Sequence, residues 1–199
     1  MSKKTYSNSN IYYKLFYLNG ERTVPAWFST CILWSCGIGL LAISALEQDK
    51  SINRYWFIIG LSLIYVSLDE MISLHEHVDN ISVLTLRYNI DLPDFLNSSW
   101  VFPAIVLVFI FFVFLLPFFA KLERQIRFLL IVSALIYLFG ACGCEMFGAY
   151  ARVNSLENLY NFAVTIEEAL EMIGAILLLH VVTSLVLHKY KEFALNSAR

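Results

Sequence analysis

Ionisable side chains stand inside three strongly apolar segments of this sequence. One segment closes with SLDEMISLHEHVD, a later one holds a glutamate in GACGCEM, and the last opens with VTIEEALEMIG. An ionised group at membrane depth costs ~2.5–3.5 kcal/mol on insertion scales, so such groups indicate a polar cavity, a partner or a functional site. The residues concerned are Asp69, Glu70, His75, Glu76, His77, Glu145, Glu167, Glu168 and Glu171.

Carboxylates and imidazoles that project inward from several helices are the ligands of di-iron and di-manganese sites in helix bundles. Those sites use a Glu-x-x-His motif on each of two helices. Here four residues separate Glu70 from His75, and the last segment offers Glu168 and Glu171 without a histidine. The match is therefore in ligand type and not in spacing. We predict a site for Fe, Mn or Zn, with these candidate ligands: Glu70, His75, Glu76, Glu145, Glu168 and Glu171.

The remaining polar residues, Asp69, His77 and Glu167, are predicted to belong to the same site without ligating a metal. Simpler explanations exist for some of the group. The stretch from His75 to His77 could be hydrated among lipid headgroups. Glu167 could stand near a helix N-terminus, where the helix dipole favours an acid. The deeper acids have no such explanation, and the pattern assigns no catalytic residue.

The composition favours a membrane protein over a soluble domain. Of the 199 residues, 59% are hydrophobic and only 15% are charged, and the mean hydropathy is +0.66. A soluble domain of this size needs more charge to cover its surface. The net charge is −2 and no basic tract is present, so nucleic acid is not predicted as a partner.

Long apolar runs predict an all-α, polytopic membrane helix bundle with about five transmembrane helices. We expect a polar or interfacial arm over 1–23, one transmembrane domain over 24–188 and a short polar tail over 189–199. The expected spans cover 24–46, 55–78, 100–120, 128–150 and 162–187.

Five spans place all three acidic groups in one half of the bilayer, because the second and fourth helices end on the side where the fifth begins. At ~100° per residue, a second helix that continues to 78 would align Asp69 with Glu76 and Glu70 with His77. Gly140, a cysteine and Gly148 repeat every four residues on the fourth helix, a pattern that permits close helix packing. Either Arg22 or Arg152 could balance part of the negative charge.

Lys and Arg are more frequent on the side that holds the C-terminus, which predicts an outside N-terminus and a cytoplasmic C-terminus. The expected surroundings are the lipid bilayer, with either a homo-oligomer or a membrane partner protein. The four cysteines lie in apolar segments at spacings unlike those of redox or zinc pairs, so we interpret them as packing residues.

Four motifs together resemble a group of uncharacterised bacterial multipass membrane proteins. They are VPAWFS, SLDEMISLHE, GACGCEM and EEALEMIG, and they cover four of the five expected spans. The resemblance implies a protein of the bacterial cytoplasmic membrane whose acidic residues define the group. It implies no reaction, substrate or cofactor.

Three functions fit the sequence. The first is a metal-binding membrane protein, which could be an enzyme. The second is a transporter or channel for protons or cations, in which the carboxylates take up and release the ion. The third is a non-catalytic subunit or receptor whose acidic pocket holds a cationic partner.

Overall fold

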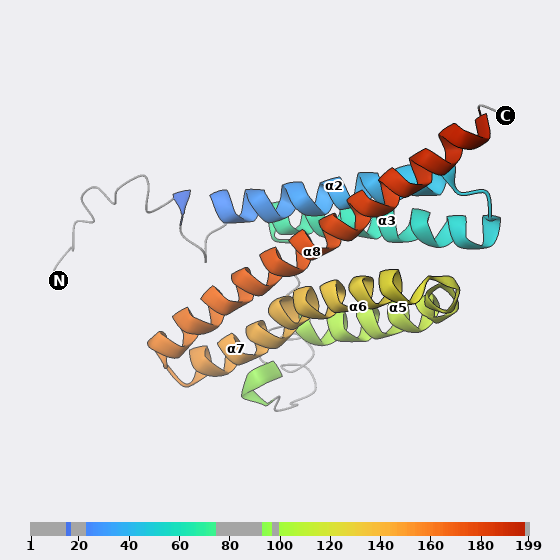
Figure 1. The fold of residues 1–199 in the computed structure, drawn as a ribbon. Coiled ribbons are helices and arrows are strands. Elements are labelled where there is room, and N and C mark those ends of the chain that lie inside the picture. The colour runs from blue at the N-terminus through green and yellow to red at the C-terminus, as the bar shows by residue number, and fades with distance from the viewer. Residues whose placement is uncertain (1–14, 17–22, 75–92, 97–99, 198–199) are drawn as a thin grey trace.

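The structure, a computed structural model, describes residues 15–16, 23–74, 93–96 and 100–197. Within these ranges the chain is helical and contains no strand (Figure 1). The main helices are α2 (Val24–Leu46), α3 (Lys50–Ile72), α5 (Val101–Lys121), α6 (Arg124–Leu138), α7 (Glu145–Val153) and α8 (Glu157–Ser197). A 3-10 turn, η2, covers Asp94–Leu96, and a π-helical turn, η3, covers Phe139–Cys144 and joins α6 directly to α7.

Five helical stretches in the described chain are long and apolar enough to cross a membrane: α2, α3, α5, the continuous run α6–η3–α7, and α8. The shortest has 21 residues, which at ~1.5 Å per residue spans the ~30 Å hydrocarbon layer. Their outer faces expose large apolar side chains, such as Leu107 and Phe109 on α5. The prediction of an all-α multipass membrane protein is therefore confirmed.

The first two spans form a tight hairpin. A Cβ atom on Gly37 of α2 would lie 2.9 Å from the carbonyl oxygen of Gly60 on α3, so only glycine allows this approach. At the turn, the Asp49 side chain accepts a 2.7 Å hydrogen bond from the Ser51 amide and caps α3. Hydrogen bonds from Ser51 hold the pKa of the Asp49 carboxyl below its usual value.

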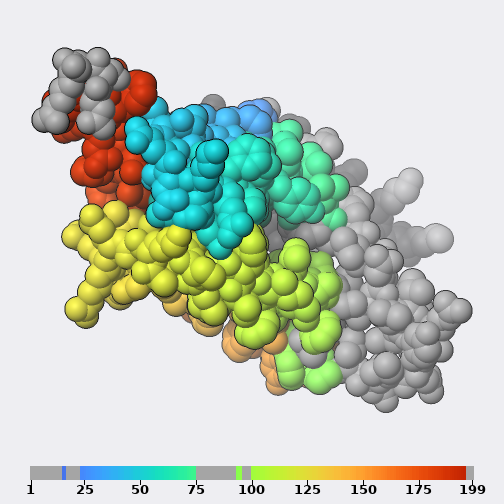
Figure 2. Space-filling model, turned by 90° about the vertical axis from the view of Figure 1, so that its right-hand side faces the viewer, coloured from blue at the N-terminus to red at the C-terminus, as the bar shows by residue number. Residues whose placement is uncertain are grey.

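The apolar core lies where α2, α3, α5 and α8 meet. The Trp56 ring of α3 packs edge-on against Phe118 of α5, with the ring centroids 4.7 Å apart. Leu33 and Leu40 of α2 and Val182 of α8 are almost fully buried beside them. Figure 2 shows the outer surface of this half, where α3 lies beside α5 and the start of α6. This apolar packing positions the four helices relative to one another without any contribution from polar contacts.

The last helix connects the two halves of the bundle. It crosses the other helices obliquely (Figure 1) and packs on α2 as well as on α6, η3 and α7. Near its far end, the Lys189 ammonium lies 3.1 Å from a Glu47 carboxylate oxygen at the α2–α3 turn. The start of α2, the end of α3 and the α7–α8 turn all lie toward the opposite end of the molecule, with the α7–α8 turn apart from the other two (Figure 1).

The predicted end of the second span was wrong. The second span was expected to continue to residue 78, but α3 ends at Ile72, and Ser73 adopts a left-handed conformation with φ of 49°. The alignment of Glu76 with Asp69 and of His77 with Glu70 therefore does not hold, because no continuous helix joins them. At the C-terminal end, α8 continues through Ser197, so the described part of the segment 189–199 is helical, and its assignment as a short polar tail stays a prediction.

The packing of α6 on α8 depends on Gly174. A Cβ atom there would lie 2.7 Å from the backbone nitrogen of Tyr137, which cannot move without shifting α6. We predict that Gly174→Ala lowers the free energy of unfolding by ~1–3 kcal/mol, the usual cost of overpacking. Thermal unfolding in detergent, followed by circular dichroism, measures this.

Gly148→Ala is the matched control in the same seam, because its Cβ would meet Tyr160 and Ala163 at ordinary distances of 3.8 and 3.9 Å. Equal unfolding temperatures for the two variants would contradict the proposed contact between α6 and α8.

Candidate carboxylate site

The π-helical turn η3 shapes one wall of the site. A π turn adds a residue to the helical repeat and frequently occurs at functional sites. Here it includes Gly140, whose absent side chain lets the helix touch α8. A Cβ atom on Gly140 would lie 3.0 Å from the carbonyl oxygen of Glu167 and 3.1 Å from the Cγ of Glu171. Gly140, Cys144 and Gly148 are all buried, so the predicted seam of small residues is present, and at Gly140 it faces Glu167 and Glu171.

The fifth span supplies three of the acids. Glu171 is 7% exposed, and it is one of the few charged or polar side chains in the described chain that are this deeply buried. The Oε2 atom of Glu168 is buried and has no hydrogen-bond partner among the described residues. Such an atom costs ~1–3 kcal/mol when nothing compensates it, and more when it is charged.

Acids from three helices interact in this place. Glu70, at the end of α3, interacts electrostatically with Glu167, Glu168 and Glu171 of α8. Glu145, the first residue of α7, interacts with Glu167 and Glu171. The structure therefore brings together the acidic groups of the second, fourth and fifth spans, and we call these five residues the carboxylate site.

Asp69 lies beside the carboxylate site, since it interacts with Tyr137 together with Glu70, Glu168 and Glu171. The predicted residues His75, Glu76 and His77 lie outside the described residues, as does Arg22. The structure therefore does not test the imidazole part of the predicted ligand set.

Arg152 is the cation that the structure places against the carboxylate site. Its guanidinium Nη2 lies 4.0 Å from Glu145 Oε1, and it also acts on Glu167. The Arg152 side chain is 59% exposed, whereas that of Glu145 is 17% exposed. Arg152 therefore balances charge at the rim of the site and not around the deeper Glu171.

Tyr137 is a site residue that the sequence analysis missed. Its side chain is partly buried against the apolar core, its backbone contacts Gly174, and it interacts with four acids from two other helices. A phenol can donate a hydrogen bond to a carboxylate or bind a metal. The spacing to Gly140 and Cys144, three and seven residues on, was the available signal, because it puts Tyr137 on the face of the small-residue seam.

Two cysteines also lie nearer to the acids than expected. Cys142 interacts with Glu145, Glu167 and Glu171, and Cys144 interacts with the last two. Both are free thiols, and Cys144 is buried in the seam. Their interpretation as packing residues fits this position, but it did not predict that they border the site.

The described residues do not by themselves present a metal centre. No group of three or more His, Cys, Asp or Glu side chains in the described ranges is arranged to hold a metal ion. The assignment of Glu70, Glu145, Glu168 and Glu171 as ligands, together with His75 and Glu76, stays a prediction.

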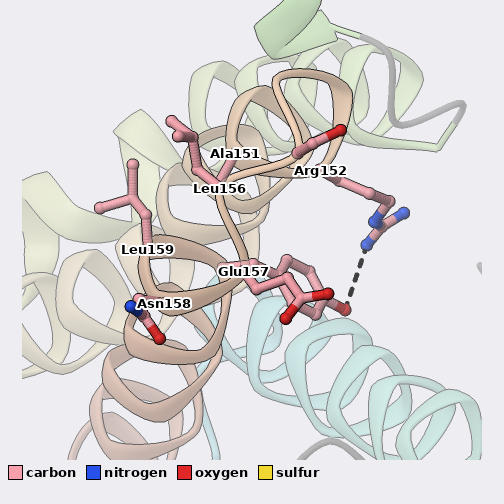
Figure 3. A pocket seen from close by; sticks show the side chains of 8 residues that line it. Ala151, Arg152, Leu156, Glu157, Asn158 and Leu159 are labelled. Atoms are coloured by element: carbon pink, nitrogen blue, oxygen red, sulfur yellow. Dashed lines mark hydrogen bonds between the residues drawn. The ribbon is translucent and has the colours of Figure 1, made fainter.

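A pocket opens beside the carboxylate site, at the turn between α7 and α8 (Figure 3). Its volume is about 790 Å³. Arg152 reaches from the end of α7 and donates a 3.4 Å hydrogen bond to the Tyr160 hydroxyl on α8. The guanidinium carbon also stands over the Tyr160 ring, 5.1 Å from its centroid. The lining residues are Ala151, Arg152, Ser155, Leu156, Glu157, Asn158, Leu159 and Tyr160.

These helices and this site define a multipass, all-α membrane protein with acidic groups inside the bundle. Residues 6–186 match the family described as Domain of unknown function (DUF8692). The match spans most of the 199 residues, so the chain belongs to this family. Neither the curated proteins nor the solved structures include a significant match.

Repulsion among the acids of the carboxylate site should lower the stability of the metal-free protein. We expect Glu168→Gln to raise the free energy of unfolding by ~1–2 kcal/mol, because it removes a buried acceptor without a donor and gives its neighbours an amide donor. The measurement is chemical or thermal unfolding of chelator-treated protein in detergent. Glu192→Gln, at the far end of α8, serves as the control. A Glu168→Gln variant less stable than the native protein would contradict the crowding argument.

Proposed function

We propose that this membrane protein binds a metal cation at the carboxylate site. The observation that carries the proposal is the unpartnered, buried Oε2 atom of Glu168, one helical turn from the deeply buried Glu171. Both side chains belong to one face of α8, and the acids of α3 and α7 interact with that face. A bound cation would supply the missing partner of Glu168 Oε2.

The charge balance supports the same proposal. The deeply buried Glu171 interacts with the other four acids of the carboxylate site, and in the described chain Arg152 reaches the site only at the rim. Repulsion and desolvation both disfavour a set of ionised acids in such a place. A divalent ion would offset two of the charges and would hold the three helices together.

The donor types indicate the class of metal. Carboxylate oxygens with imidazole nitrogens suit Fe, Mn and Zn. Glu70, Glu145, Glu168 and Glu171 are the proposed oxygen ligands, and His75 and Glu76, in the chain that follows α3, are proposed to complete the set. If one coordination position stays open to water or substrate, such a metal permits hydrolytic or oxidative chemistry. We therefore propose a metal-binding membrane protein. If the metal keeps an open position, the hypothesis extends to a metal-dependent enzyme.

Metal content tests the proposal directly. The protein is purified in detergent without chelator, and Fe, Mn and Zn are measured per chain by inductively coupled plasma mass spectrometry. We expect near-stoichiometric metal in the native protein and at least ~tenfold less in the double variant Glu168→Gln with Glu171→Gln, because loss of ligands weakens binding steeply. Glu192→Gln is the control and keeps the native content.

Two results would overturn the proposal. The first is a native protein that stays free of these metals after incubation with each of them. The second is a double variant that retains the native amount while the control behaves normally. Either result would mean that protons or a cationic partner, and not a metal, neutralise the carboxylates, as in the transporter and receptor hypotheses.

A further inference from the structure

We infer that the pocket at the α7–α8 turn binds a phosphate-bearing headgroup of a membrane lipid, with phosphatidylethanolamine as the preferred class. This inference concerns a different place from the proposed metal site and does not require a bound metal. It rests on the position of the pocket, on the N–H donors of Arg152 and on the acid Glu157 that lines the same pocket.

The pocket lies at the junction of two membrane-spanning helices. Its lining runs from Ala151 to Tyr160, and the two spans that it joins are Arg124–Val153 and Glu157–Leu195. A hollow at the junction of two spans stands at the depth of lipid headgroups. Leu156 lines it as well and is 44% exposed, so the wall offers an apolar contact beside its polar groups.

Arg152 has donors available for a phosphate. A guanidinium carries five N–H donors in a planar fork that matches phosphate oxygens. In the described chain the structure gives Arg152 one hydrogen bond, to Tyr160. Its distance of 4.0 Å to Glu145 is an ion pair without a hydrogen bond. The contact with the Tyr160 ring holds the guanidinium at the pocket, so a phosphate could dock without rearranging the helix ends.

Glu157 determines which headgroup fits best. Its carboxylate lines the same pocket as Arg152, so the pocket presents a positive and a negative group within one small volume. Phosphatidylethanolamine carries a phosphate for the guanidinium and a primary ammonium, a three-donor group, for the carboxylate. Phosphatidylglycerol would bring only the anion, and phosphatidylcholine has a quaternary ammonium without N–H donors. The pocket therefore favours the ethanolamine headgroup.

The same arginine connects the pocket to the carboxylate site. Arg152 interacts with Glu145 and Glu167 while it lines the pocket. A phosphate that binds the guanidinium would compete with these two acids for its charge. Lipid binding would in this way alter the charge balance at the rim of the carboxylate site.

The experiment measures lipid binding to the full chain in detergent by native mass spectrometry, with short-chain phosphatidylethanolamine, phosphatidylcholine and phosphatidylglycerol, and with inorganic phosphate as a separate arm. We expect phosphatidylethanolamine to bind at least ~threefold more tightly than the other lipids. Arg152→Gln should weaken binding of phosphatidylethanolamine ~tenfold or more, the size expected for a lost charge-assisted bond. Glu157→Gln should remove the preference for ethanolamine over choline.

Two milder variants keep the test decisive if Arg152→Gln does not fold. Arg152→Lys keeps the charge and loses the fork, and Tyr160→Phe keeps the ring and loses the hydroxyl, so each should weaken binding by ~threefold. Arg124→Gln, at the start of the fourth span, is the control with native binding.

Equal binding of phosphatidylethanolamine to the native protein and to the Arg152 variants would overturn the inference. Phosphate binding that depends on Arg152 without Arg152-dependent lipid binding would overturn the lipid assignment and identify free phosphate as the source. Metal content is recorded for the same samples. A native protein that binds lipid but no metal supports this inference while it refutes the proposed function.

Discussion

The structure depends on the burial of carboxyl groups inside a membrane bundle. Lipid cannot solvate a charged or hydrogen-bonding group, so every acid in the spans must face the protein interior. The chain meets this constraint by collecting the acids of α3, α7 and α8 in one half of the molecule. Elsewhere the bundle is stabilised by apolar contacts such as that of Trp56 with Phe118. These contacts do not involve the acids of the carboxylate site.

Close backbone approach is what lets the acids converge. Gly140 and Gly174 lie on opposite sides of one seam, and a Cβ atom on either would collide with the facing helix. The π turn η3 lies in this seam and directly precedes Glu145. The small residues and the π turn of the fourth span therefore belong with the glutamates of the fifth span, because the close packing of the two helices brings these glutamates next to Glu145.

The sequence predicted the spans and the place where their acids meet, because hydrophobic length and the alternation of spans are strong constraints in a membrane. It failed where local backbone geometry decides. The residues around Ser73 include no glycine or proline that would predict the end of a helix. Ser73 nevertheless adopts a left-handed conformation and α3 ends at Ile72, so the prediction of a helix to residue 78 was wrong.

Contacts between spans were also difficult to predict. Tyr137 resembles any aromatic residue in an apolar run, and its position among four acids appears only when α3 and α8 are placed around it. Arg152 was recognised as a charge partner, but its pairing with Tyr160 around a pocket needs the turn between α7 and α8 in three dimensions. The chain belongs to the DUF8692 family, whose description names no chemistry.

A double-mutant cycle between Glu70 of α3 and Glu168 of α8 tests most directly whether acids from separate helices share one site. The free energies of unfolding are measured for metal-free native protein, Glu70→Gln, Glu168→Gln and the double variant. Neighbouring charges should give a coupling energy of ~0.5–3 kcal/mol, whereas distant sites add within ~0.3–0.5 kcal/mol. A coupling clearly above that additive range is the predicted result, and strict additivity would contradict the existence of a common carboxylate site.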